Sequence, residues 1–150
     1  MDRPGNLMMI SGVLVFGQRV RVDRVKRIIR ERFCRFQRFR QRPVQLLGAA
    51  YWENVPHFSI DDHVLSVALP GRAGTKELQA LVSRLASRPL DPARPMWEFH
   101  LVENFDRGSA LIARIHHCYA DGIALVRVMM SMTDAAPNGP PAMPFEAIPR

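Results

Sequence analysis

The chain has 150 residues, enough for one domain with a hydrophobic core, and its hydrophobic content of 47% excludes an entirely disordered protein. The formal net charge of +7 is unevenly distributed, because the segment from Gly17 to Pro43 holds ten arginines and one lysine against Asp23 and Glu31, a local charge of +9. The remainder of the chain is therefore slightly acidic, at −2. The basic segment suits an anionic membrane surface, nucleotide phosphates or nucleic acid, and the alternative is a solvated helix face.

The sequence has only two cysteines, Cys34 and Cys118, too few for a disulfide framework, so we expect a reducing, cytoplasmic environment. No apolar run approaches the roughly 18 residues of a membrane-spanning helix. Leu7 to Phe16, which follows Arg3, has some likeness to a signal peptide, but no small-residue cleavage site comes after it. Its Val, Ile and Leu residues, bounded by glycine, instead predict a buried strand.

An amphipathic helix is predicted from Val22 onward. Apolar residues recur there at helical spacing with arginines between them, so one stripe should face a sheet while the basic face stays in solvent. Pro43 should end this region. The stripe consists of Val25, Ile28, Ile29, Phe33 and Phe36.

Two further strands and a second helix follow. Gln45 to Trp52 and Val64 to Leu69 are predicted strands, separated by a polar stretch. The second helix should begin near Thr75, with this residue as its N-cap. Its apolar face is formed by Leu78, Leu81, Val82 and Leu85.

The last third of the chain predicts a β-hairpin, from Trp97 to Val102 and from Ser109 to Ile115, followed by an apolar helix from Ile123 to Met130. Strands mixed with helices predict an α/β fold with a mixed β-sheet and flanking helices. Five prolines in the last fourteen residues predict a folded domain over residues 1–134 and a linker or tail over residues 135–150.

Chemistry is concentrated in the string His116-His117-Cys118-Tyr119-Ala120-Asp121-Gly122, between a predicted strand and a predicted helix. A histidine at a strand end can project into a cleft, and an imidazole can take a proton from an alcohol. Asp121 can hold the helix start by accepting backbone N–H bonds, and Gly122 allows helix and strand to approach closely.

Three other interpretations of this string compete with a catalytic base. The histidine pair can be structural, in the core or at the surface. A metal site would need more ligands than the two histidines and Asp121, so no metal is predicted. Cys118 as a nucleophile would need a low-pKa thiolate and an orienting third group, which the sequence does not contain.

The string HHxxxDG resembles the active-site motif of the chloramphenicol acetyltransferase-like superfamily, which includes the condensation domains of peptide synthetases. Pro89-Leu90-Asp91 through Arg94-Pro95-Met96-Trp97-Glu98 resembles the PLDxxRPLWE motif of the bacterial wax ester synthase/diacylglycerol acyltransferase family. The opening Met1-Asp2-Arg3-Pro4 with Asn6-Leu7-Met8 resembles the first strand of its mycobacterial-type members, and Phe33 to Arg42 resembles its FPRFRQR-like segment. The ordered set covers nearly the whole chain up to Asp134.

The resemblance implies one half of a two-subdomain fold and an acyl-CoA-dependent O-acyltransferase of lipid metabolism, which makes triacylglycerol or wax esters from diacylglycerol or a long-chain alcohol. His117 would be the base that deprotonates the acceptor hydroxyl for direct attack on the acyl-CoA thioester, and His116 would support its geometry. Asp121 would be structural and turned toward an arginine, and Gly122 would permit the tight helix start.

The resemblance also implies the surroundings of this site. The PLDxxRPxWE stretch would form a rigid turn beneath the site or line the cleft, through Pro89, Asp91, Arg94, Pro95, Trp97 and Glu98. No bound cofactor is implied, because acyl-CoA is a cosubstrate. The protein would lie in the cytoplasm, with peripheral contact to the inner membrane or lipid inclusions through the basic segment.

Members of this family continue into a second subdomain and usually carry a short segment before the stretch that matches Met1. We therefore expect weak activity from this chain alone and a second-half polypeptide as partner. The alternatives are a non-catalytic remnant and a condensation-type acyltransferase, against which the PLDxxRPxWE stretch argues. No nucleic acid partner is predicted, because Phe33, Phe36 and Phe39 fit the core face of a helix and no nucleic-acid motif is present.

Overall fold

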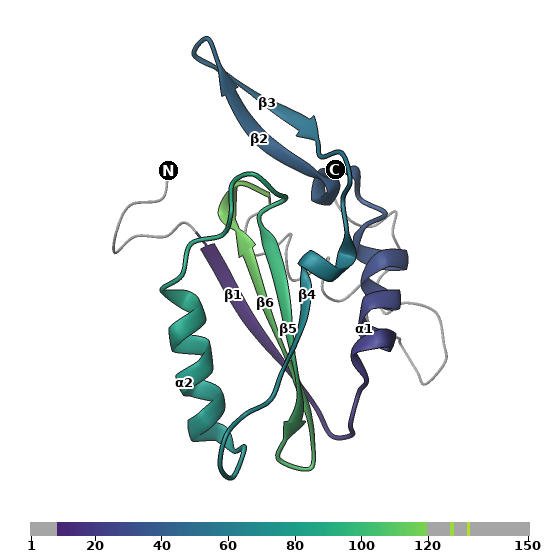
Figure 1. Cartoon of the computed structure of the whole chain (residues 1–150), viewed down its shortest axis with the longest axis vertical. Helices are drawn as coiled ribbons and strands as arrows, with labels where there is room; N and C mark the ends of the chain where they lie inside the picture. Colours follow the sequence, from purple (N-terminus) through teal and green to yellow (C-terminus); the bar gives the residue numbers. More distant parts are fainter. Residues whose placement is uncertain (1–8, 120–126, 128–131, 133–150) are drawn as a thin grey trace.

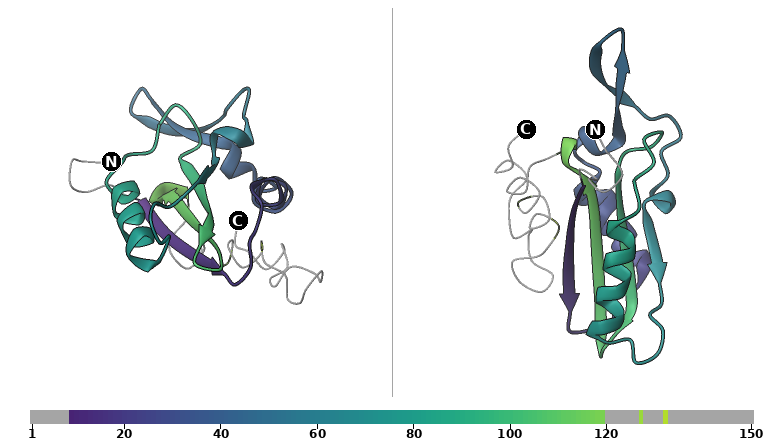
Figure 2. Two further views of the ribbon diagram at one scale, coloured as in Figure 1. Left: turned by 60° about the horizontal axis from the view of Figure 1, so that its bottom comes forward. Right: turned by 90° about the vertical axis from the view of Figure 1, so that its left-hand side faces the viewer.

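The computed structural model describes residues 9–119 together with Arg127 and Met132. A four-stranded sheet has the order β1-β6-β5-β4, with β4 parallel to β5 and the other neighbours antiparallel (Figure 1). Its strands are β1 (Met9–Phe16), β4 (Val64–Val67), β5 (Trp97–Phe105) and β6 (Gly108–His116). Helices α1 (Val22–Ile28) and α2 (Thr75–Ala86) lie on opposite faces of this sheet (Figure 2). The predicted α/β fold with a mixed sheet is confirmed.

The sheet separates two hydrophobic clusters because successive residues of a strand point to opposite faces. On β6, Leu111, Ala113 and Ile115 belong to the cluster on the α1 side, whereas Ala110 and Ile112 belong to the cluster on the α2 side. Each fully buried aliphatic or aromatic side chain stabilises such a core by about 1.5–3 kcal/mol. Both faces of β6 are therefore held by packing.

The predicted amphipathic helix is confirmed, although its second half is not regular α-helix. A π-helical turn, Ile29–Phe33, continues α1. Val25, Ile29 and Phe33 are buried, while Ile28 and Phe36 are partly buried. The stripe faces the sheet, as the spacing predicted, and Phe33 stacks within the aromatic part of the core.

The strand β1 lies at an edge of the described sheet, and the prediction of a buried strand is wrong. It pairs with β6 on one side. Val13 and Val15 on this strand are 41% and 61% exposed. An apolar run in the sequence indicates a hydrophobic strand, but it does not predict how many neighbouring strands will pair with it.

The prediction of one strand from Gln45 to Trp52 is also wrong, because this segment is a tight hairpin. Strand β2 (Gln41–Leu46) pairs antiparallel with β3 (Ala49–Asn54) and forms a separate two-stranded sheet. Leu47 and Gly48 form the turn with positive φ angles of 53° and 78°, the left-handed conformation of a two-residue type I′ turn. Pro43 does not end a region but lies within β2, where a two-stranded ribbon tolerates its missing N–H.

The second helix matches its prediction except at its cap. Leu78, Leu81 and Leu85 are buried on one face. The N-cap is Gly74 and not Thr75, and the Glu77 carboxylate accepts the Gly74 N–H at 3.0 Å. The predicted strand from Val64 to Leu69 is confirmed in its first four residues, as β4.

The predicted hairpin is confirmed as β5–β6, the central pair of the sheet. Its turn includes Asp106 with φ 51°. Gly108 is needed where it lies, because a Cβ there would collide with the backbone carbonyl of Phe16 at the end of β1. The expected helix from Ile123 to Met130 and the boundary after residue 134 lie outside the described residues. Among the residues that are described, no helix is long and apolar enough to cross a membrane.

Candidate active site

The histidine pair lies where β6 ends. His116 is the last residue of the strand, and its backbone N–H donates to the carbonyl of Met96 at 2.9 Å. The chain then turns through a short 3-10 helix, His117–Tyr119, in which the Cys118 N–H donates to His116 Nδ1 at 3.2 Å. A neutral His116 ring held in this way carries its proton on Nε2. His117 follows directly and is exposed.

Tyr119 anchors the other side of this turn. Its ring is buried, and its hydroxyl donates to the carbonyl of Gln41 at 2.7 Å while accepting the Met96 N–H at 2.9 Å. Burial raises the pKa of the Tyr119 phenol above its usual range, so the hydroxyl stays protonated and can donate. The exposed residues His117 and Cys118 are therefore held between two buried ones, Ile115 and Tyr119.

The PLDxxRPMWE stretch begins as a turn that its own side chains close. Asp91 Oδ1 accepts the Ala93 N–H at 2.9 Å, and the Arg94 N–H donates to the Asp91 carbonyl at 3.2 Å. The Arg94 guanidinium lies 3.9 Å from the carboxylates of Asp91 and Asp62. Pro89 and Arg94 are exposed and Pro95 is buried. Asp91 thus closes the turn through bonds made within it.

Trp97 connects this turn with the core. It is completely buried, its indole N–H donates to the carbonyl of Phe39 at 2.7 Å, and its ring lies 4.7 Å from Phe33. The ring also stacks on His63, with centroids 4.4 Å apart. Trp97 pairs with Ile115 in the sheet, so it lies beside the residue two positions before His117.

His63 is a buried residue of this region that the sequence did not single out. Its Nδ1 donates to the carbonyl of Trp97 at 2.7 Å, and only 3% of its surface is exposed. Burial lowers the pKa of His63 below its usual value, because the charged imidazolium would lose its hydration. His63 is therefore a neutral structural support for Trp97. The polar stretch contains two histidines, His57 and His63, and nothing in the sequence singles out His63 for this role.

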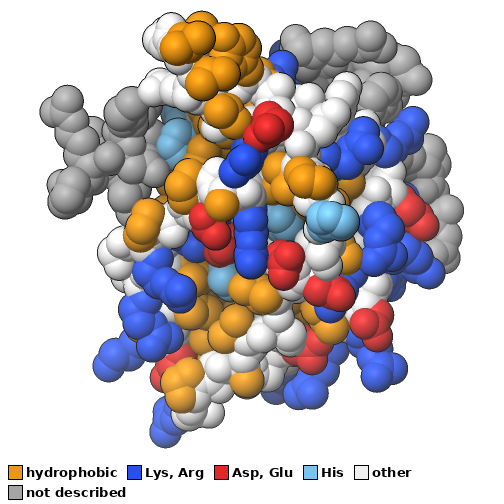
Figure 3. Space-filling model, turned by 45° about the horizontal axis from the view of Figure 1, so that its top comes forward, with side chains coloured by type: hydrophobic (Ala, Val, Ile, Leu, Met, Phe, Trp, Pro, Cys, Tyr) orange, Lys and Arg blue, Asp and Glu red, His pale blue; other side chains and the backbone are white. Residues whose placement is uncertain are grey.

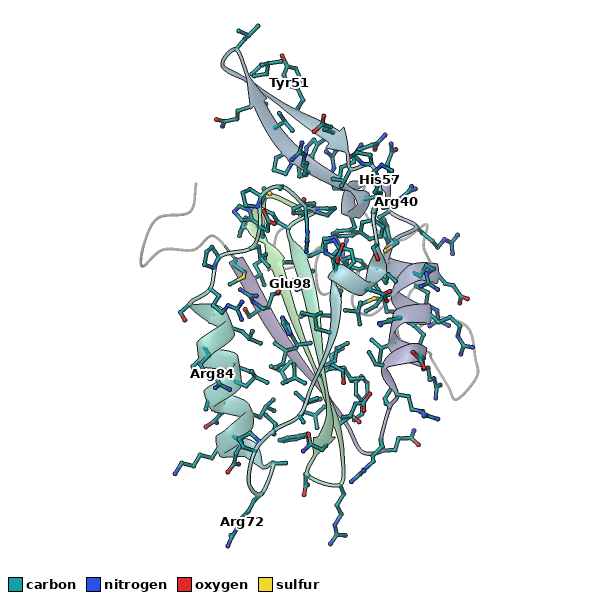
Figure 4. All side chains as sticks on the ribbon, in the orientation of Figure 1. Arg40, Tyr51, His57, Arg72, Arg84 and Glu98 are labelled. Carbon is teal, nitrogen blue, oxygen red and sulfur yellow. The ribbon has the colours of Figure 1, made fainter. Side chains whose placement is uncertain are left out.

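Glu98 takes part in a polar cluster on the α2 side of the sheet (Figure 4). Its Oε2 accepts from Arg114 Nη1 at 2.8 Å and from His100 Nε2 at 3.1 Å. The His100 hydrogen bond, with help from Arg114, lowers the pKa of the Glu98 carboxyl against the opposing effect of burial. Arg114 is 2% exposed and also donates to the carbonyl of Arg88, while its Nε is buried without a partner in the described part of the chain.

The structure brings the two sequence motifs together through Met96, which bonds with both His116 and Tyr119. Trp97 and Glu98 belong to the same stretch but point to opposite faces of the sheet. Asp121 and Gly122 lie outside the described residues, so their roles and the arginine partner of Asp121 remain predictions.

Neither cysteine forms a disulfide, and the two differ in surroundings. Burial raises the pKa of the Cys34 thiol to about 11, so it is not a nucleophile at neutral pH. Cys118 is exposed beside His117. Within residues 9–119, no three His, Cys, Asp or Glu side chains gather as metal ligands.

An apolar pocket of about 380 Å³ lies between β1 and α1. Its lining includes Leu14, Phe16, Val20, Val25, Ile28 and Leu111. Leu111 points to the same face of β6 as Ile115. From Leu111 to His116, where β6 ends, the strand spans roughly 17 Å at about 3.4 Å per residue, and His117 follows directly.

Known proteins resemble this chain over much of its length. A structure of the wax ester synthase/diacylglycerol acyltransferase from Marinobacter aquaeolei VT8 superposes with a TM-score of 0.72 and 27% identity, covering 94% of this chain and 38% of that one. The starter condensation domain of rhizomide synthetase RzmA superposes with a TM-score of 0.70, covering 84% of this chain and 31% of that one. Its 13% identity shows a shared fold only.

The Mycobacterium tuberculosis protein named "Probable diacyglycerol O-acyltransferase tgs1" is 38% identical over 99 residues, which are 65% of this chain and 21% of that protein. This chain therefore spans about a fifth of the length of the curated relatives it matches. The sequence profile of the wax ester synthase/diacylglycerol acyltransferase catalytic domain matches residues 1–150. The chain belongs to the wax ester synthase/diacylglycerol acyltransferase catalytic domain family.

Proposed function

We propose that this domain supplies the general base for acyl transfer from acyl-CoA to the hydroxyl of a diacylglycerol or a long-chain alcohol, which forms triacylglycerol or a wax ester. The observation that carries the proposal is the position of His117 in a chain of this family. His117 is exposed at the end of a buried strand, between the anchored residues Ile115 and Tyr119.

The reaction needs one base that changes its protonation twice. The neutral His117 imidazole accepts the proton of the acceptor hydroxyl as its oxygen attacks the thioester carbonyl carbon. The tetrahedral intermediate then collapses, the C–S bond breaks, and the CoA thiolate takes the proton from the imidazolium. Acyl-CoA is a cosubstrate in this scheme, and no bound cofactor takes part.

Of the two neighbours of His117, only His116 has a role in this proposal. His116 positions the turn, because its Nδ1 accepts the Cys118 N–H and its own N–H bonds with Met96. Cys118 takes no part, since direct transfer needs no acyl-enzyme. The PLDxxRPMWE turn is a rigid support, because Trp97 is hydrogen-bonded to the carbonyl of Phe39. The hydrogen bond from the Met96 N–H to the Tyr119 hydroxyl connects this turn with the histidine turn.

The apolar pocket between β1 and α1 is suited to the acyl chain. It lies on the α1 side of the sheet, the side to which Ile115 of β6 points, and its lining is largely aliphatic. Replacing the partly buried Ile28 with Trp should fill it and shift the preference toward shorter acyl-CoA substrates. Assays with a series of acyl-chain lengths test this, and an unchanged preference would contradict it.

The lipid acceptor places the protein at a lipid surface, so we propose peripheral contact with an anionic inner membrane or lipid inclusion through the basic segment. On α1, Arg24, Arg27 and the following Arg30 are exposed. Each basic residue near an anionic bilayer contributes about 1 kcal/mol of attraction. Several together would give reversible, salt-sensitive binding.

Ester formation from acyl-CoA and diacylglycerol tests the proposal directly. We expect weak or undetectable turnover from these 150 residues alone, because relatives are much longer and both substrates need positioning by a complete channel. Co-expression with the remaining part of a relative, as a second-half partner, should restore turnover that depends on His117. Restored turnover that is the same with His117→Ala would refute the assigned base.

A further inference from the structure

The β2–β3 hairpin projects beyond the main sheet and exposes its outer end (Figures 1 and 2). Every residue from Gln45 to Tyr51 is exposed. Leu47 at the tip is 96% exposed, Leu46 is 57% exposed and Tyr51 is 48% exposed. Large apolar side chains gathered at one projecting end are unusual for a surface that meets only water.

The two faces of this hairpin have different surroundings. Cross-strand partners share a face, so Trp52 lies opposite Pro43 on one face, where its ring is 5.0 Å from Tyr119 and packs at the base of the hairpin. The other face carries the apolar pairs Val44 with Tyr51 and Leu46 with Ala49. This second face and the turn form a continuous apolar surface, which we call the hairpin tip: Val44, Leu46, Leu47, Ala49 and Tyr51.

Charge is absent from the tip and begins at the base of the hairpin. No residue from Pro43 to Trp52 is charged. Below it, Arg42 pairs with Glu53 at 2.8 Å, and Arg38 and Arg40 add exposed positive charge, with Arg38 stacked over Trp52 at 4.1 Å. In Figure 3 hydrophobic side chains gather at the top of the molecule, with charged side chains below them.

We propose that the hairpin tip inserts into the surface of an anionic phospholipid bilayer while Arg38 and Arg40 contact its headgroup phosphates. An apolar end above a cationic base matches the order of layers in such a surface, with hydrocarbon inside and negative charge outside. From Arg42 to Leu46 the strand rises by roughly 13 Å, which suits insertion to about 5–10 Å. The inference rests on the peripheral contact proposed above and names the part of the chain that enters the lipid.

Leu47 makes the proposal testable without damage to the fold. Its φ of 53° is the left-handed conformation, and Asn followed by Gly is the favoured pair for a type I′ turn. Folding therefore does not require leucine at this position. Leu47→Asn should retain the hairpin and remove the most exposed apolar side chain.

The experiment compares sedimentation of the whole chain with vesicles of phosphatidylcholine alone and with added phosphatidylglycerol. Wild-type protein should bind the anionic vesicles, and Leu47→Asn should bind them roughly 10-fold more weakly, as expected for loss of one inserted leucine. Leu65→Asn is the matched control, because Leu65 is 38% exposed on β4, away from the hairpin. Arg38→Gln with Arg40→Gln should reduce the preference for phosphatidylglycerol.

The outcomes separate this proposal from the more general one. Equal binding by wild type, Leu47→Asn and Leu65→Asn would overturn insertion of the hairpin tip and leave peripheral contact intact. No binding by wild type would overturn both, without bearing on His117. Self-association in the absence of lipid that Leu47→Asn abolishes, with no vesicle binding, would assign the tip to a second copy of the chain and overturn the lipid assignment.

Discussion

Two hairpins of this chain, β5–β6 and β2–β3, are both paired antiparallel but differ in how much of the fold surrounds them. In the main sheet, β5 lies between β4 and β6, and β6 lies between β5 and β1. Most of their side chains are buried on both faces. The β2–β3 hairpin pairs only with itself, and its outer end is exposed.

The difference shows two ways in which a fold presents side chains. At the end of β6, the core determines the backbone, so the exposed His117 is held in place by buried neighbours. At the tip of β2–β3, only the local turn determines the backbone, so side chains there can change without disturbing the core. Near the end of β6, substitutions of the exposed His117 should affect chemistry and those of its buried neighbours should affect stability, whereas substitutions at the hairpin tip should affect stability little.

The largest effect is expected from His117→Ala in a context that has activity. Turnover should fall by roughly 100- to 10,000-fold with little change in the free energy of unfolding, because the role proposed for this exposed imidazole is proton transfer and not packing. Cys118→Ala is the adjacent control and should be tolerated. A dead Cys118→Ala enzyme, or an acyl-thioester trapped on that residue, would contradict direct transfer.

A smaller effect, on stability, is expected from Tyr119→Phe. Loss of the hydroxyl leaves the Met96 N–H and the Gln41 carbonyl without this partner, which should lower the free energy of unfolding by about 1–3 kcal/mol. Tyr51→Phe removes the same atom from the exposed hairpin and should change stability little. Chemical denaturation of both variants makes the comparison, and equal losses would show that the two regions do not differ as described.

The pH dependence of stability should report on His63. Because burial lowers its folded pKa below 6.5, the unfolded chain binds a proton first as the medium is acidified. The stability contributed by neutral His63 is thus present above about pH 6.5 and is lost as pH falls through the lower folded pKa. His63→Phe keeps a ring beside Trp97 but cannot titrate, so its unfolding free energy should depend less on pH in this range. Identical slopes in the two proteins would contradict this account.

The smallest effect is expected from Leu47→Asn on stability, in contrast to its effect on lipid binding. Asn adopts the left-handed conformation more readily than Leu, so thermal unfolding should show a gain of about 1 kcal/mol or less. Gly48→Ala is the opposing control, because φ of 78° disfavours any Cβ, and it should lower stability. A marked loss of stability in Leu47→Asn would mean that Leu47 packs against the fold.

Sequence patterns predicted elements well where local chemistry and the fold agree. The α2 face was visible because Leu78, Leu81 and Leu85 repeat at the helical period, and β5–β6 was visible because a glycine-containing turn separates two apolar runs. The β2–β3 turn was missed because Leu47 occupies a position where Asn or Gly signals a hairpin. Leucine at this position therefore gives no sequence signal for the turn.

In the candidate site, too, the sequence indicated residues of a contiguous motif and did not indicate long-range contacts. His117 could be proposed from a contiguous string, and its place after a buried strand agrees with the structure. The support of Trp97 by His63 joins residues 34 positions apart, and the hydroxyl of Tyr119 reaches 78 positions back to Gln41. Contacts of this kind depend on tertiary packing and leave no periodic trace in the sequence.

The hydroxyl of Tyr119 has a consequence for regulation, because it joins the two hairpins. It bonds with Gln41 at the start of β2 and with Met96, whose carbonyl holds His116. Because one hydroxyl makes both bonds, a shift of the hairpin base that breaks the bond with Gln41 would leave the hydroxyl free to reorient at Met96. If lipid at the proposed tip and substrate at the proposed base favour different arrangements of this hydroxyl, each lowers the affinity for the other by the same factor. Under the two proposals, the phenol of Tyr119 would place the lipid surface and the proposed base in one thermodynamic cycle.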